Sequence, residues 1–66
     1  MMNRLKVERA EQSLSQADLA ERIGVSRQTI NSIETGRYVP SAVLALKLAR
    51  VFQKPVEAVF ALEETD

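Results

Sequence analysis

Residues 16–35 read QADLAERIGVSRQTINSIET, and this stretch decides the fold. Its apolar residues recur at the spacing of two short amphipathic helices, with Gly24 between them. Ser15, followed three residues later by Asp18, forms a variant of the capping box, and Ser26 can cap the second helix. Gly24 suits the left-handed backbone that ends many helices. The stretch therefore predicts a helix, a tight turn and a second helix.

The second helix of this unit has an apolar side and a polar side. Five apolar residues can lock the two helices together: Leu19, Ile23, Val25, Ile30 and Ile33. Five hydrogen-bonding residues, none of them acidic, occupy the outer side: Arg27, Gln28, Asn31, Ser32 and Thr35. A short polar helix held outward suits the major groove of DNA, which is about 12 Å wide. The alternative is a helical hairpin with a solvated polar side, although such a surface normally includes Glu and Lys.

Outside this unit the sequence predicts three more helices. Asn3 can cap a first helix that continues to about Gln12, and Ser41 can cap a fourth helix with an apolar face. Pro55 fits the first turn of a fifth helix that extends through Phe60. We therefore expect an all-α fold of five short helices, in a single domain that spans the whole chain, residues 1–66.

Length and composition limit the functions open to this chain. It has 66 residues, a mass of 7.4 kDa, and neither cysteine nor histidine. The missing residues exclude disulfides and remove the usual ligands of a metal site and the usual partners of a catalytic nucleophile. No apolar run reaches the roughly 20 residues that span a bilayer, and the N-terminus has no signal-peptide pattern. We expect a cytoplasmic protein without membrane association, metal, cofactor or enzymatic activity.

Basic and acidic residues are segregated along the chain although the net charge is zero. Residues 22–54 contain six basic residues against Glu34 alone, a net charge of +5. Residues 55–66 contain four carboxylates and no basic residue. The basic middle segment could bring one face of the protein to phosphates, and an unevenly charged solvated surface is the alternative.

Four motifs carry a resemblance to a known family: VERAE (7–11), SQADLAERIG (15–24), VSRQTINSIE (25–34) and GRYVPS (36–41). They resemble the Cro/phage-repressor-type helix-turn-helix DNA-binding proteins, and among them the small stand-alone bacterial and archaeal regulators. The resemblance covers nearly the whole chain. It implies a lambda-repressor-like fold with a helix-turn-helix at about residues 16–35, and binding of double-stranded DNA.

The resemblance also implies roles for individual residues. Gln16 matches the residue that touches the DNA backbone and braces the recognition helix. Arg27, Gln28 and Ser32 match base-reading positions, with Asn31 on the same polar side. Thr35, Arg37 and Tyr38 lie where phosphate contacts are usual in the family. Ser13 replaces a common glycine of the first loop.

Side-chain chemistry supports these roles independently. The amide of Gln28 both donates and accepts, so it can read adenine N6 and N7, and Arg27 can read guanine O6 and N7. The free N–H groups at the start of the helix near Gln16 can bind a phosphate.

Glu34 is the one carboxylate of the basic middle segment. Its spacing from Ile30 and Ile33 turns it inward, toward the first helix, where Arg9 is placed to meet it. The family has an ion pair at these two positions. The alternative is an exposed and unpaired Glu34.

A single recognition helix reads only a few base pairs, which is too few to select a site from a genome. We therefore expect a homodimer that binds an inverted repeat, with residues 55–66 as the dimerisation segment. The apolar residues that we assign to the interface are Val56, Val59, Phe60 and Leu62. The alternative is that Val56, Val59 and Phe60 close the core of the monomer.

The leading interpretation is a sequence-specific transcriptional regulator, with repressor as the expected sign, and with no small-molecule ligand. A second interpretation keeps the fold but makes the chain an antitoxin or a controller protein whose main partner is another protein. A third, an enzyme, lacks His, Cys and a cleft with paired carboxylates; Glu63, Glu64 and Asp66 could bind a cation loosely, but a solvated tail is the favoured interpretation of these residues.

Overall fold

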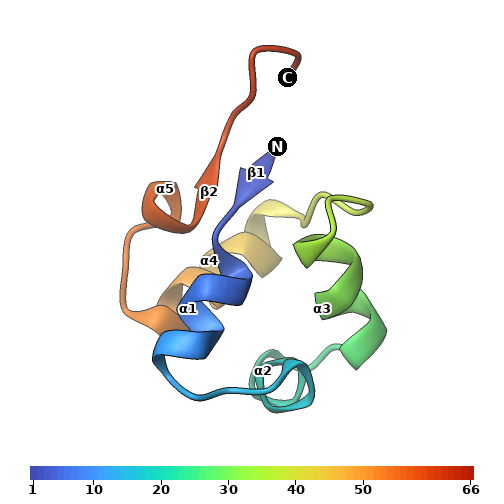
Figure 1. Ribbon diagram of the computed structural model, residues 1–66, viewed down its shortest axis with the longest axis vertical. Coiled ribbons are helices and arrows are strands. Elements are labelled where there is room, and N and C mark those ends of the chain that lie inside the picture. Colours follow the sequence, from blue (N-terminus) through green and yellow to red (C-terminus); the bar gives the residue numbers. More distant parts are fainter.

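The computed structural model describes residues 1–66 and contains five helices and two short strands. In chain order they are β1 (Met2–Asn3), α1 (Leu5–Glu11), α2 (Gln16–Ile23), α3 (Arg27–Glu34), α4 (Ala42–Phe52), α5 (Val56–Val59) and β2 (Phe60–Ala61). Figure 1 shows α3 standing at one side of the molecule, α2 across the bottom, and α1 in front of α4. The prediction of five short helices is confirmed.

Local capping explains where the central helices begin and end. The Ser15 hydroxyl accepts from the Asp18 N–H at 2.9 Å, and the Asp18 carboxylate accepts from the Ser15 N–H at 3.0 Å. Ser26 caps α3 and Ser41 caps α4 in the same way, each through its hydroxyl. Gly24 ends α2 with φ +76°, the left-handed conformation expected of it.

The two strands were not expected from the sequence. They pair antiparallel, with Met2 opposite Ala61 and Asn3 opposite Phe60, and bring the two ends of the chain together (Figure 1). This pairing corrects two expectations. Asn3 belongs to a strand and α1 begins at Leu5, although the Asn3 side chain still accepts from the Leu5 N–H at 3.2 Å. Phe60 belongs to β2 and not to the fifth helix, which ends at Val59.

One apolar core joins all five helices. Its fully buried members include one residue from α1, one from α2, two from α3, one from α4 and one from α5: Leu5, Leu19, Ile30, Ile33, Leu48 and Val59. Because α3 spends its apolar side on this core, its opposite side must face outward. No helix is both long enough and apolar enough to cross a bilayer.

Candidate nucleic-acid interface

The tight turn between α2 and α3 fixes the outward side of α3. The Val25 N–H donates to the Ala20 carbonyl at 3.0 Å across the left-handed Gly24, so only a few residues separate the two helices. Four members of the expected polar side are exposed and Ser32 is half-buried; the exposed ones are Arg27, Gln28, Asn31 and Thr35. The structure therefore places together the residues that the sequence assigned to base reading.

Gln16, in the first turn of α2, connects that helix to the outer side of α3. Its Nε2 donates to Asn31 Oδ1 at 3.1 Å and to Glu34 Oε1 at 3.2 Å. Its Oε1 accepts from Arg27 Nη1 at 3.5 Å. One side chain thus hydrogen-bonds to three residues of α3 and limits the movement of that helix relative to α2.

The Arg9–Glu34 ion pair is present and lies behind the same network. Arg9 Nε donates to Glu34 Oε2 at 2.5 Å and Arg9 Nη2 donates to Glu34 Oε1 at 3.1 Å, a two-point contact. Arg9 Nη1 also donates to the Leu14 carbonyl at 2.9 Å. The Glu34 side chain is only 6% exposed, so its charge is turned away from the outer side of α3. The hydrogen bonds that Arg9 donates to the Glu34 carboxylate raise the pKa of the guanidinium above its ordinary value.

An open hollow of about 380 Å³ lies beside α3 and is lined by Ser26, Gln28, Thr29, Ser32 and Tyr38. The loop after α3 stays close because the Arg37 and Tyr38 N–H groups donate to the Ser32 carbonyl at 2.9 and 3.2 Å. Sequence reasoning missed Ser26 and Thr29 as members of this surface. The signal available in the sequence was the capping role of Ser26, since the residue that caps α3 lies at its N-terminal end, next to Arg27 and Gln28.

Thr35 differs from the other polar residues of α3. Its hydroxyl already donates to the Asn31 carbonyl at 2.9 Å, within its own helix. The cations on this side, Arg27 and Arg37, are exposed and belong to no ion pair. The outer side of α3 and the adjoining loop thus present amide, hydroxyl and guanidinium groups without a facing carboxylate.

A second buried carboxylate was missed by the sequence analysis. Glu8 is 2% exposed, and both of its oxygens accept from Lys54 Nζ, one of them at 2.6 Å. This hydrogen bonding raises the pKa of Lys54, and Glu11 lies 3.5 Å from the same ammonium. The signal available in the sequence was that Glu8 shares the apolar face of α1 with Leu5, where a carboxylate needs a partner.

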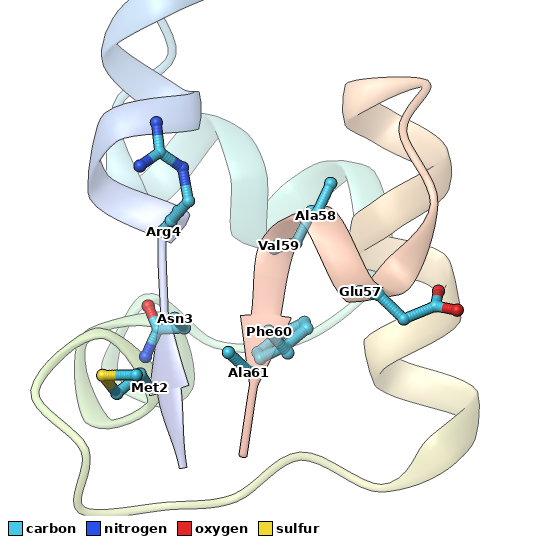
Figure 2. A pocket seen from close by; sticks show the side chains of 8 residues that line it. All are labelled: Met2, Asn3, Arg4, Glu57, Ala58, Val59, Phe60 and Ala61. Carbon is cyan, nitrogen blue, oxygen red and sulfur yellow. The ribbon is translucent and has the colours of Figure 1, made fainter. Parts of the chain in front are cut away.

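The expected dimerisation residues divide into two groups. Val59 and Phe60 are 1% and 8% exposed and close the core of the protomer. Val56 is half-buried, and Leu62 is 78% exposed. Figure 2 shows β1 and β2 beside α5. Residues of these three elements, with Arg4, line a hollow of about 250 Å³. Of the four assigned residues, only Leu62 is a large exposed apolar side chain.

Comparison with known proteins follows this geometry. The family model Helix-turn-helix (HTH_3) matches residues 5–59. The chain is 48% identical over 66 residues to the uncharacterized HTH-type transcriptional regulator MJ0272 of Methanocaldococcus jannaschii, covering the whole of both chains. It is 50% identical over 64 residues to the uncharacterized HTH-type transcriptional regulator YgzD of Bacillus subtilis, covering 97% of each chain.

Among solved structures, the fold is similar to that of the restriction-modification controller protein C.AhdI from Aeromonas hydrophila. The TM-score is 0.78 with 32% sequence identity, and the match covers 85% of each chain. The helix-turn-helix geometry, the family match over most of the chain and these full-length relatives agree with one another. The chain therefore belongs to the helix-turn-helix family of the Cro/phage-repressor type.

Proposed function

We propose that this protein is a sequence-specific DNA-binding transcriptional repressor that binds an inverted repeat as a homodimer. The observation that carries the proposal is the outer side of α3, which is polar, free of carboxylates and braced by Gln16. Such a helix fits the major groove with its side chains against base edges. The family membership and the transcriptional regulators among the relatives support the same conclusion.

In this proposal the polar residues divide the work of recognition. Gln28 and Arg27 read base edges, and Ser32 contacts a base through its short side chain. Asn31 is aligned by its hydrogen bond with Gln16. Arg37 and Tyr38, held on the loop after α3, contact phosphates together with Thr35 and the start of α2 at Gln16. The contacts to phosphate position the protein, and the contacts to bases specify the sequence.

Selection of bound sequences from a random pool of duplexes tests this function. We expect enrichment of an inverted repeat whose half-sites are about one helical turn apart, because two recognition helices related by a dyad are spaced by about 34 Å. Binding should weaken steeply with salt as phosphate contacts release counterions. A pool that shows no enrichment after repeated rounds would contradict the proposal.

The dimer requires an apolar surface outside the protomer core. Since Val59 and Phe60 are buried in the core of the protomer, we assign that surface to Leu62 and the half-buried Val56. Val59 and Phe60 contribute as part of the core against which Val56 packs. Light scattering at micromolar concentration should give twice the chain mass, and Leu62→Asp should shift it toward the monomer. Val7→Asp, on the exposed side of α1, is the matched control and should leave the mass unchanged. A Leu62→Asp protein that stays dimeric would remove this surface from the interface.

A second candidate function is that of a controller protein with a protein partner. The similarity to C.AhdI, whose printed description is a restriction-modification controller protein, favours it. Affinity capture from the source organism separates the two functions. A repressor should bind its selected duplex without any protein partner. Capture with a controller of the second kind should also recover a second protein in stoichiometric amount.

A further inference from the structure

Three cations gather on a surface that the proposed base contacts do not use. Arg22 on α2 and Lys47 and Arg50 on α4 line a hollow of about 200 Å³ whose floor includes Ile23 and Val51. All three cations are exposed, and none belongs to an ion pair. No carboxylate lines the hollow, and it shares no residue with the hollow beside α3. We call this surface the basic hollow.

The basic hollow holds most of the free positive charge of the basic middle segment. Of its six basic residues, Lys54 is neutralised by Glu8, Arg27 belongs to α3, and Arg37 lies on the loop after α3. The remaining three form the basic hollow. Cations placed together repel one another unless an anion lies between them, so this arrangement favours an anionic partner.

Two carboxylates approach the basic hollow from the adjoining face of α2. Asp18 and Glu21 line a separate hollow with Leu14 and Arg22. The Asp18 carboxylate accepts from the Ser15 N–H in the capping box at 3.0 Å and also interacts electrostatically with Arg22. Neither carboxylate reaches an ion-pair distance from any of the three cations.

The position of Arg22 indicates which kind of anion can bind in the basic hollow. Arg22 lies in the last turn of α2, and only residues 24–26 separate α2 from the first turn of α3. The basic hollow therefore borders the N-terminal end of α3, the end that approaches base edges in a helix-turn-helix complex. If the duplex beyond the half-site bends toward α4, its phosphates come to Lys47 and Arg50.

We propose that Arg22, Lys47 and Arg50 bind the phosphates of the duplex that flanks each half-site. The inference rests on the proposed function, since it places the flank relative to a recognition helix in the groove. It extends the footprint of the protein and makes affinity depend on the length and flexibility of the flanks.

The test compares two duplexes that carry the same selected sequence. The short one ends at the outer edges of the half-sites, and the long one adds about one helical turn, roughly 10 base pairs, on each side. The wild-type protein should bind the long duplex on the order of tenfold more tightly at low salt. Lys47→Gln/Arg50→Gln should lose this advantage and bind the short duplex within about twofold of wild type. Its slope of log affinity against log salt on the long duplex should fall by about 3.6, because each of the two protomers loses two phosphate contacts.

A matched control removes the same charge elsewhere. Arg4 and Lys6 are exposed, outside every ion pair and on the N-terminal side of the molecule, so Arg4→Gln/Lys6→Gln should keep the preference for the long duplex. Arg50→Lys should keep it as well, because the charge is retained. Thermal melts of all variants establish that they are folded.

Three results would overturn the inference. The first is a preference for the long duplex that Lys47→Gln/Arg50→Gln leaves intact, and the second is an equal loss in Arg4→Gln/Lys6→Gln. The third is a Lys47→Gln/Arg50→Gln protein that keeps the wild-type affinity for DNA but no longer binds an acidic peptide. This result would assign the basic hollow to a protein partner. A wild-type protein that binds neither duplex would instead contradict the proposed function, so the two failures are distinguishable.

Discussion

Neighbouring residues of α1 serve two different regions of the molecule. Arg9 points toward α3 and pairs with Glu34, whereas Glu8 points toward the end of α4 and pairs with Lys54. Both pairs place a carboxylate almost out of contact with water. They differ in what lies beyond them. Glu34 also accepts from Gln16, which hydrogen-bonds to Asn31 and Arg27 at the outer side of α3. Glu8 instead accepts from Lys54, and its contacts do not reach α3.

The chemistry of an ion pair therefore does not by itself assign its role. A pair whose network continues to an exposed polar face can affect binding as well as stability. A pair that ends in the core affects stability alone. The predictions below separate the two regions, starting with the largest expected effect.

Breaking the Arg9–Glu34 pair should have the largest effect on stability. Arg9→Met or Glu34→Leu leaves an unpaired charge in a buried position and should lower the free energy of unfolding by about 3 kcal/mol. The double variant should recover part of this loss, because no charge is left unpaired. Urea denaturation of the four proteins measures the coupling. Strictly additive losses would contradict an interaction between the two side chains.

Lys54→Met should also lower the melting temperature, because it leaves the buried Glu8 carboxylate without its hydrogen-bond partner. The folded state raises the pKa of Lys54 above 10.5, mainly through its hydrogen bond with Glu8. The stabilisation is therefore fully present below about pH 10.5 and is lost as the pH rises through the raised pKa. Melts from pH 7 to 11.5 should show this alkaline loss in wild type and not in Lys54→Met. Binding of the selected duplex at neutral pH, below the melting temperature, should be unchanged.

Asp18 should make the helix-turn-helix unit sensitive to acid. Hydrogen bonds from the Ser15 backbone and side chain lower the pKa of Asp18 below 3.8. Its contribution to stability is present above the unfolded value of about 3.8 and is lost as the pH falls through the lowered pKa. Asp18→Asn should therefore flatten the pH dependence of the melting temperature in this range. Glu21→Gln, on the same helix but outside the capping box, is the control and should not flatten it.

Ser13→Gly should have the smallest effect and should be stabilising. Ser13 has φ +55°, a left-handed conformation that favours glycine. Relief of this strain, reduced by the greater freedom of glycine in the unfolded chain, should add about 0.5 kcal/mol. Chemical denaturation measures the change. A loss of stability in Ser13→Gly would show that the serine side chain makes a compensating contact.

Local signals in the sequence were sufficient for the helix-turn-helix unit. Ser15, Asp18 and Gly24 act within one helical turn of their own positions, so their spacing alone predicts the caps and the turn. The outer side of α3 follows from the apolar side, because a helix that buries Ile30 and Ile33 on one side turns its opposite side outward.

The remaining features depend on contacts between distant parts of the chain. β1 and β2 have two residues each, too few for an alternating pattern, and they pair across almost the full length of the chain. Glu8 finds its partner 46 residues away, at Lys54. An apolar residue such as Val59 or Phe60 is suited both to the core of a protomer and to the interface of a dimer. The sequence alone therefore could not show that both residues lie in the core.

The central claim is that the outer side of α3 reads bases, and titration of Gln28→Ala and Arg37→Ala with labelled duplexes tests it most directly. Both side chains are exposed, so both variants should melt as wild type does. Gln28→Ala should lose about 1–3 kcal/mol per half-site on the selected duplex and almost nothing on a random duplex. Arg37→Ala should weaken binding to both duplexes alike. An equal loss on both duplexes in Gln28→Ala, or no loss on the selected one, would contradict the account.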